Sequence, residues 1–211
     1  AARRNVRVRL LVDDNGTSGM DEKLAALDAV PNGEVRLFNP FVHRRFKFLG
    51  FLADFKRLNR RMHNKSLTVD GQVTVVGGRN IGDQYFGATA DIAFADLDVF
   101  VAGAVVDEVS RDFDRYWNSA SAYPLRSLVA AAPSQGASNP APDPAGGGID
   151  GPARAYVQAV TQSRFVEDLI AGRLELQWVP VRMVSDDPAK VLDRAPPEAL
   201  LLPRLTRLLG R

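Results

Sequence analysis

Residues 63–70 read His63-Asn64-Lys65-Ser66-Leu67-Thr68-Val69-Asp70, and six residues later the chain continues as Gly77-Gly78-Arg79-Asn80. The alternating side chains over 65–76 predict two strands, and Asp70-Gly71 is typical of the turn of a hairpin between them. On one strand, His63 and Lys65 point to the same face. Gly77-Gly78 permits a tight backbone, so we expect Asn80 to return close to His63.

This grouping suits a phosphoryl group. The imidazole of His63 can attack phosphorus, the ammonium of Lys65 can neutralise charge, and the amide of Asn80 can donate a hydrogen bond. The alternative is a surface hairpin with incidental polar residues.

The sequence around the hairpin alternates between strand and helix patterns. Strands over 6–12 and 34–38, with a helix over 20–30 between them, predict a parallel βαβ unit. We expect the later elements in this order: a strand over 97–101, a helix over 105–118, a helix over 153–171, a strand over 174–181 and a helix over 198–209.

Composition excludes several kinds of site. The chain has 211 residues, of which 45% are hydrophobic and 25% charged, as in globular proteins. Because cysteine is absent, disulfides, thiolate metal sites and cysteine nucleophiles are excluded. No apolar run is long enough to span a membrane. The only histidines are His43 and His63, and no His/Asp cluster has metal-ligand spacing. We therefore expect neither a metal nor a cofactor.

Basic residues are concentrated early in the chain. Residues 1–65 hold 14 Lys and Arg against 7 Asp and Glu, whereas residues 66–127 hold 4 against 9. An amphipathic helix over 42–62 is predicted, with Phe46 and Phe48 among its basic residues. Such interleaving can mark a surface that lies against lipid headgroups. A solvated helix face and packing within the domain are the alternatives.

The motif H-x-K-x4-D-x6-G-G-x-N resembles the HKD signature of the phospholipase D superfamily. The flanking stretches Leu10-Leu11-Val12-Asp13-Asp14-Asn15 and Ile81-Gly82-Asp83-Gln84-Tyr85-Phe86-Gly87 are similar to its bacterial cardiolipin synthase branch. The resemblance covers about residues 5–127 and is weaker at 184–188 and 198–209. It implies an α/β fold, a phospholipase D-like α-β-α sandwich in which helices flank a mixed sheet.

The family carries two HKD motifs in one chain, whereas this sequence has one, because no Lys or Asp follows His43 at the required spacing. We therefore expect one half of a two-half enzyme; pairing of two copies is the alternative. The expected organisation is a catalytic half over 1–127, a linker or mobile loop rich in Pro, Gly and Ala over 128–152, and a segment over 153–211 that leads into a second half.

The resemblance also implies roles in catalysis. One motif histidine attacks the phosphodiester phosphorus and forms a phosphohistidine, and the other protonates the leaving alcohol and then deprotonates the acceptor. His63 is then catalytic, with the nucleophile role favoured, and Lys65 and Asn80 hold the phosphate oxygens with Gly78 beside them.

Acidic residues supply the remaining candidates. A carboxylate on the second nitrogen of His63 would fix its tautomer. Asp96, before a strand that ends at Gly103, is the candidate, and Asp98 is the alternative; either can also be an ordinary solvent-facing acid. For Asp70, bonding to turn amides is favoured over proton transfer.

The loop after the first strand supplies further candidates. Asp13, Asp14 and Asn15 follow this strand at its carboxyl edge, where α/β sites form. Asn15 is the candidate for contact with substrate, and an ordinary loop is the alternative.

The expected function is a phosphatidyltransferase that makes cardiolipin from phosphatidylglycerol and phosphatidylethanolamine. The alternatives are a phospholipase D or nuclease that transfers to water, and an inactive half-enzyme. The expected partners are phospholipid, a membrane surface and a second HKD half or second copy, with nucleic acid disfavoured. The expected location is bacterial and peripheral at the cytoplasmic (inner) membrane.

Overall fold

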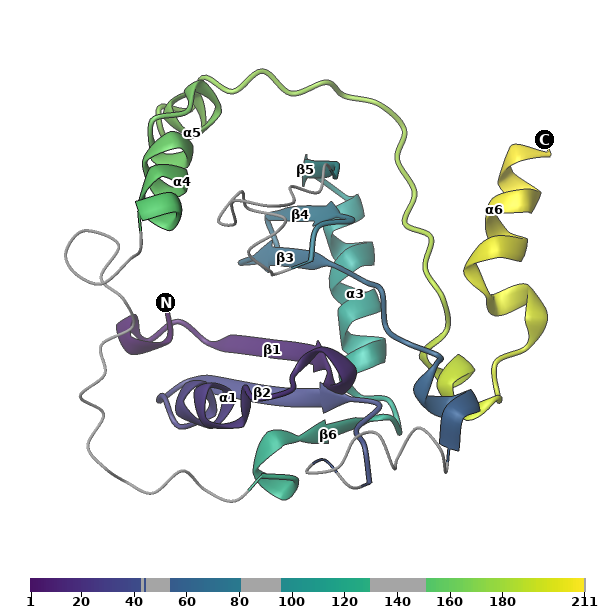
Figure 1. The fold of residues 1–211 in the computed structure, drawn as a ribbon. Coiled ribbons are helices and arrows are strands. Elements are labelled where there is room, and N and C mark those ends of the chain that lie inside the picture. Colours follow the sequence, from purple (N-terminus) through teal and green to yellow (C-terminus); the bar gives the residue numbers. More distant parts are fainter. Residues whose placement is uncertain (43, 45–53, 81–95, 130–150, 211) are drawn as a thin grey trace. The chain divides into compact units, whose positions relative to one another are not determined.

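The computed structural model describes residues 1–42, 44, 54–80, 96–129 and 151–210 (Figure 1). The chain divides into two compact units. Unit 1 comprises Ala1–Asn64, Ala104–Gly136 and Met183–Arg211, and unit 2 comprises Lys65–Gly103 and Ala137–Arg182. No helix among the described residues is both long and apolar enough to cross a membrane. Phe46, Phe48 and most of the expected linker lie outside the described residues, and the domain boundaries stay a prediction.

Unit 1 contains a mixed three-stranded sheet in the order β1-β2-β6. Strands β1 (Val8–Asp13) and β2 (Gly33–Phe38) are parallel, and helix α1 (Asp21–Asp28) connects them. The predicted parallel βαβ unit is therefore confirmed. The short strand β6 (Ala122–Pro124) pairs antiparallel to β2.

The core of unit 1 forms on both faces of β2, because successive side chains of a strand point to opposite faces. Leu37 packs in a cluster with Leu24 of α1, whereas Phe38 packs against Tyr116 of α3 (Val105–Trp117). Helix α3 buries residues at helical spacing, among them Val109, as predicted for 105–118. Each of these buried side chains contributes about 1.5–3 kcal/mol.

Unit 2 contains an antiparallel sheet in the order β3-β4-β5, formed by Ser66–Val69, Val73–Gly77 and Asp98–Ala102. Asp70 and Gly71 have φ angles of 51° and 65°, as a type I′ turn requires. The N–H of Gln72 donates to the carbonyl of Val69 over 3.0 Å and closes the turn. The predicted hairpin is confirmed.

The remaining elements are mostly short helices. Helices α4 (Gly151–Thr161) and α5 (Arg164–Ile170) belong to unit 2, and α6 (Leu201–Leu209) belongs to unit 1. Short 3-10 helices lie at Ala2–Arg4, Asp14–Gly16, Leu125–Ser127, Pro188–Leu192 and Pro197–Ala199. Residues 54–58 are also helical; they belong to the predicted helix over 42–62, of which residues 43 and 45–53 lie outside the described part of the chain.

The α/β class implied by the family resemblance is confirmed, and the strands are distributed over two small sheets. The prediction of a strand over 174–181 is wrong, because this segment has no regular structure. A strand needs a partner for its backbone groups, and Pro180 has no N–H to offer one. Most of its large apolar side chains are exposed, with Trp178 78% accessible.

Candidate functional site

The glycine pair of the motif lies directly against two acidic residues at one end of the unit 2 sheet. Gly77 pairs with Asp98 in register, and the N–H of Gly78 donates to the carbonyl of Leu97 over 3.3 Å. A Cβ added to Gly78 would lie 2.6 Å from Oδ2 of Asp96. Glycine at 78 therefore makes the room in which the carboxylate of Asp96 lies.

Lys65 belongs to the same end of this sheet. Its carbonyl accepts a hydrogen bond from the N–H of Gly77 over 3.2 Å, so its backbone lies beside the glycine pair. Asn80 follows shortly after and is exposed. Unit 2 thus brings together the backbone of Lys65, the glycine pair and the two candidate acids Asp96 and Asp98.

The two candidate acids differ in their contacts. Asp98 forms an ion pair with Arg79, with 2.8 Å between its Oδ2 and the arginine Nε. Asp96 is exposed and accepts a hydrogen bond over 2.8 Å from the N–H of Leu97, its own neighbour. Because Asp98 is already engaged by a cation, the geometry favours Asp96 as the carboxylate that can serve a reacting group.

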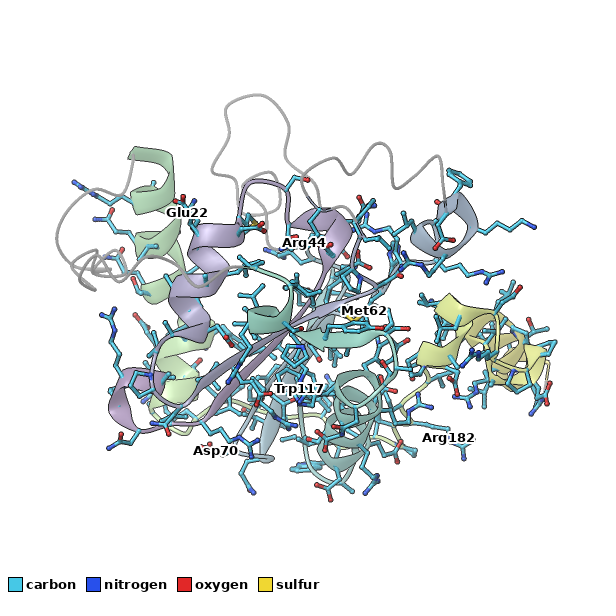
Figure 2. All side chains as sticks on the ribbon, turned by 90° about the horizontal axis from the view of Figure 1, so that it is seen from below. Glu22, Arg44, Met62, Asp70, Trp117 and Arg182 are labelled. Carbon is cyan, nitrogen blue, oxygen red and sulfur yellow. The ribbon has the colours of Figure 1, made fainter. Side chains whose placement is uncertain are left out.

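Asp70 lies at the other end of the hairpin, at the turn, and is exposed (Figure 2). Five residues separate it from Lys65, which corresponds to about 16 Å of extended chain. The structure does not bring Asp70 together with the other motif residues of unit 2. This placement favours the turn role for Asp70 over proton transfer.

His63 lies in unit 1, on a segment without regular structure, because β3 begins only at Ser66. The expectation that His63 and Lys65 share one strand is therefore wrong. Side chains hold the segment instead. The N–H of Met62 donates to Oδ2 of Asp13 over 2.8 Å, and Nδ2 of Asn64 donates to Oδ2 of Asp112 over 3.1 Å.

The acidic loop after β1 has a structural role. Asp14 is fully buried, and its Oδ1 lies 3.0 Å from Nη2 of Arg44, which is itself only 9% exposed. Asp14 also accepts hydrogen bonds from the hydroxyl of Thr17 and the N–H of Phe41, over 2.7 and 2.9 Å. Asn15 is half-buried at the carboxyl edge of β1 and keeps its place as a candidate for substrate contact.

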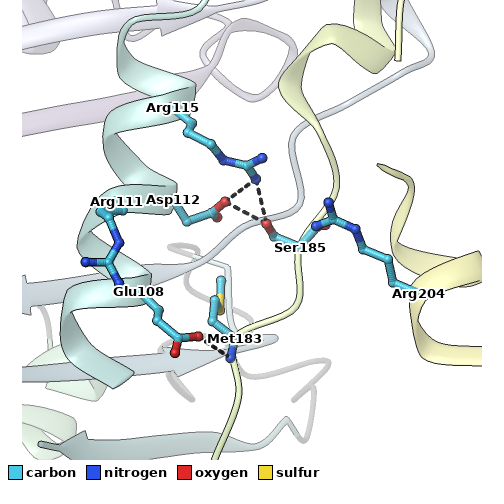
Figure 3. Close-up of a pocket in the computed structure, with 7 residues that line it drawn as sticks. All are labelled: Glu108, Arg111, Asp112, Arg115, Met183, Ser185 and Arg204. Atoms are coloured by element: carbon cyan, nitrogen blue, oxygen red, sulfur yellow. Dashed lines mark hydrogen bonds and ion pairs between the residues drawn. The ribbon is translucent and has the colours of Figure 1, made fainter. Parts of the chain in front are cut away.

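Unit 1 also contains a pocket of about 200 Å³ that the sequence did not predict (Figure 3). It is lined by residues of α3, of the segment around Ser185 and of α6: Glu108, Arg111, Asp112, Arg115, Met183, Ser185 and Arg204. Oδ1 of Asp112 accepts hydrogen bonds from Arg115 and from Ser185, both over 2.6 Å. In the sequence, only the charged side of α3 pointed to this pocket, and the charged side of an amphipathic helix usually faces solvent.

Tyr116, which follows the pocket residue Arg115, also joins α3 to the segment around Ser185. Its hydroxyl donates to the carbonyl of Asp186 over 3.1 Å. Burial, and then the nearby carboxylate of Asp112, raise the pKa of Tyr116 well above its ordinary value. Tyr116 therefore acts here as a neutral donor. Within the described ranges, no group of three or more His, Cys, Asp or Glu could hold a metal ion.

Comparison with known proteins places all the predicted site residues in one matched region. The family described as "Cardiolipin synthase, PLD-like domain" matches residues 1–117. The chain is 49% identical over 210 residues to cardiolipin synthase C of Escherichia coli K12, covering 100% of this chain and 44% of that protein. It is 31% identical over 121 residues to the major cardiolipin synthase ClsA of Bacillus subtilis 168, covering 57% of this chain and 23% of that protein. The chain thus spans less than half the length of these relatives.

Proposed function

Because the chain belongs to the cardiolipin synthase family of phospholipase D-like domains, we propose that it forms part of a phosphatidyltransferase that joins two phospholipids. The observation that carries the proposal is the packing of Asp96 against Gly78, at the end of the sheet where Lys65 also lies. This packing supports the proposal, because an acid lies beside the glycine pair of the motif.

The proposed first step is attack by the imidazole of His63 on the phosphorus of a donor phospholipid. A nitrogen–phosphorus bond forms, and the bond from phosphorus to the headgroup oxygen breaks. The histidine of a second motif gives its proton to the leaving alcohol. In the second step this histidine takes the proton of the acceptor's hydroxyl, whose oxygen attacks phosphorus and releases His63.

Lys65 and Asn80 are proposed to stabilise the charge that develops on the phosphate oxygens. The ammonium acts as a point charge and the amide as a directed donor. Asp96 is proposed to accept a hydrogen bond from the second nitrogen of His63, which fixes the tautomer that attacks. The second histidine is proposed to come from a second HKD half or from a second copy of the chain.

The proposed substrates are phosphatidylglycerol and phosphatidylethanolamine at the surface of a bacterial inner membrane. Two findings support a lipid substrate. The first is that both relatives are named cardiolipin synthases. The second is the excess of basic residues over 1–65, since cations attract anionic headgroups.

The test is a transfer assay on vesicles of these two lipids, read by lipid mass spectrometry. The chain is compared with His63→Ala and with His43→Ala, its only other histidine. Cardiolipin that disappears in His63→Ala and persists in His43→Ala is the expected result. Phosphatidic acid without cardiolipin would show hydrolysis instead. If a folded chain gives no product alone and none when a second HKD half is added, the proposal is refuted.

A further inference from the structure

We propose that Asp112 is a positioning residue for His63 and that it acts through the side chain of Asn64. The inference deepens the proposed function, on which it rests only in taking His63 as the reacting group. All three residues belong to unit 1, so the geometry is that of one compact body.

The backbone around His63 is fixed on both sides by buried or half-buried carboxylates. Before it, the N–H of Met62 is held by Asp13 over 2.8 Å. After it, the amide of Asn64 is held by Asp112 over 3.1 Å. Because Asn64 is the next residue along the backbone, the anchor on its side chain restricts how the backbone of His63 can turn.

These two hydrogen bonds matter because no strand pairing fixes the backbone at His63. Sheet pairing in this stretch begins at Ser66, so it does not fix the backbone of His63. A nucleophile must stay close to one productive geometry, and a misplacement of 1 Å can cost about 100-fold in rate.

Asp112 is itself rigidly held. It is only 7% exposed, and its Oδ1 accepts two short hydrogen bonds, from Arg115 and Ser185 (Figure 3). Arg115 also donates to Ser185 over 3.0 Å, which closes a triangle. The two carboxylate oxygens of Asp112 therefore make different contacts. Oδ1 joins α3 to the segment around Ser185, and Oδ2 accepts the hydrogen bond from Asn64.

A purely structural role for Asp112 makes a different prediction. If it only joined α3 to Ser185, Asp112→Asn would leave the imidazole of His63 undisturbed. If the proposal holds, Asn64→Ala and Asp112→Asn disturb the same imidazole, and Asp112→Asn adds nothing once Asn64 is gone.

The test is NMR of the imidazole nitrogens in the 211-residue chain, which contains only two histidines. His43→Gln assigns the two sets of signals. We expect Asn64→Ala and Asp112→Asn to change the tautomer balance or the titration midpoint of His63 and to leave His43 unchanged. Asp114→Asn is the matched control, because Asp114 lies on the same helix and pairs with Arg9 instead.

Two outcomes would overturn the inference. One is a folded Asn64→Ala chain whose His63 signals match those of the unchanged protein. The other is a double variant whose His63 signals change by the sum of the two single changes. If Asp112→Asn fails to fold, Asn64→Ala alone decides the matter. Because the readout is not activity, a failure here is distinct from a failure of the transfer assay.

Discussion

Alanine substitutions at the neighbouring Gly77 and Gly78 should have different consequences. Gly77→Ala should mainly reduce stability, and Gly78→Ala should mainly reduce transfer activity. In Gly77→Ala, the new Cβ would clash with the side-chain Oδ1 of Asp98, and it would also lie 2.7 Å from the carbonyl oxygen of Leu97 and 2.8 Å from Cα of Asp98. The last two are backbone atoms of the region that pairs with β4, so they cannot rotate away as a side chain can. Ordinary contact needs about 3.4 Å or more, so the strands must separate by roughly 0.6–0.7 Å. Overpacking of this kind costs about 1–3 kcal/mol.

In Gly78→Ala, the three atoms nearest to the new Cβ all belong to one side chain. This Cβ would lie 2.6 Å from Oδ2 and 2.7 Å from Cγ of Asp96, which is exposed and can rotate toward solvent. The loss of stability should stay below about 1 kcal/mol, because the smaller freedom of alanine in the unfolded chain offsets part of the clash. The carboxylate, however, must move by roughly 1 Å, and transfer activity should fall by up to about 100-fold.

Thermal unfolding followed by circular dichroism separates the two effects. At about 2–4 °C per kcal/mol for a chain of this size, Gly77→Ala should lower Tm by roughly 2–12 °C and Gly78→Ala by less than about 4 °C. In an Asp96→Ala background the clash at Gly78 is gone, so Gly78→Ala should not be destabilising there. Equal losses of Tm for the two variants, or a loss at Gly78 that persists without Asp96, would refute the reasoning.

The remaining predictions concern unit 1. Asp14→Asn should destabilise the protein by about 3–5 kcal/mol, because it leaves Arg44 without its buried counter-charge. Asp21 pairs with the same Nη2 of Arg44 but is itself exposed, so Asp21→Asn should cost less than about 1 kcal/mol, as urea unfolding would show. Burial raises the pKa of Asp186, but hydrogen bonds from Lys190 and the backbone outweigh it and lower the pKa overall. A lowered pKa stabilises the folded protein above the unfolded pKa of about 3.9, and this is lost on acidification through the folded pKa. Urea midpoints should therefore fall more steeply below pH 4 in the unchanged protein than in Asp186→Asn.

Local signals in the sequence were sufficient for the parts of the fold that depend on near neighbours. Asp70-Gly71 predicted the hairpin because these residue types tolerate positive φ, and both adopt it. The spacing of Val109 and Tyr116 predicted α3, because one face of a helix repeats every three to four residues. The position of Asp96 just before β5 was also predicted, and its role in catalysis stays a prediction.

Long-range contacts were not predictable in this way. Asp112 looked like one more charged residue on a solvated helix face, yet it is buried by Ser185, far away in the sequence. Asp14 looked like an ordinary loop acid, although it forms a buried pair with Arg44. In both cases the partner is chosen by tertiary packing, which residue periodicity does not encode.

The hydrogen bond between Asp112 and Ser185 also bears on the order in which the chain can fold. It joins residues 73 positions apart, and the bond from Tyr116 to Asp186 spans 70. Such contacts form late, since the entropy of closing a long loop must be lost before the bond compensates for it. The β3–β4 hairpin needs no such closure and can form in microseconds. During synthesis from the N-terminus, His63 therefore emerges long before Ser185 is available to bind Asp112. A nascent chain thus contains the motif before it contains all the residues that position His63.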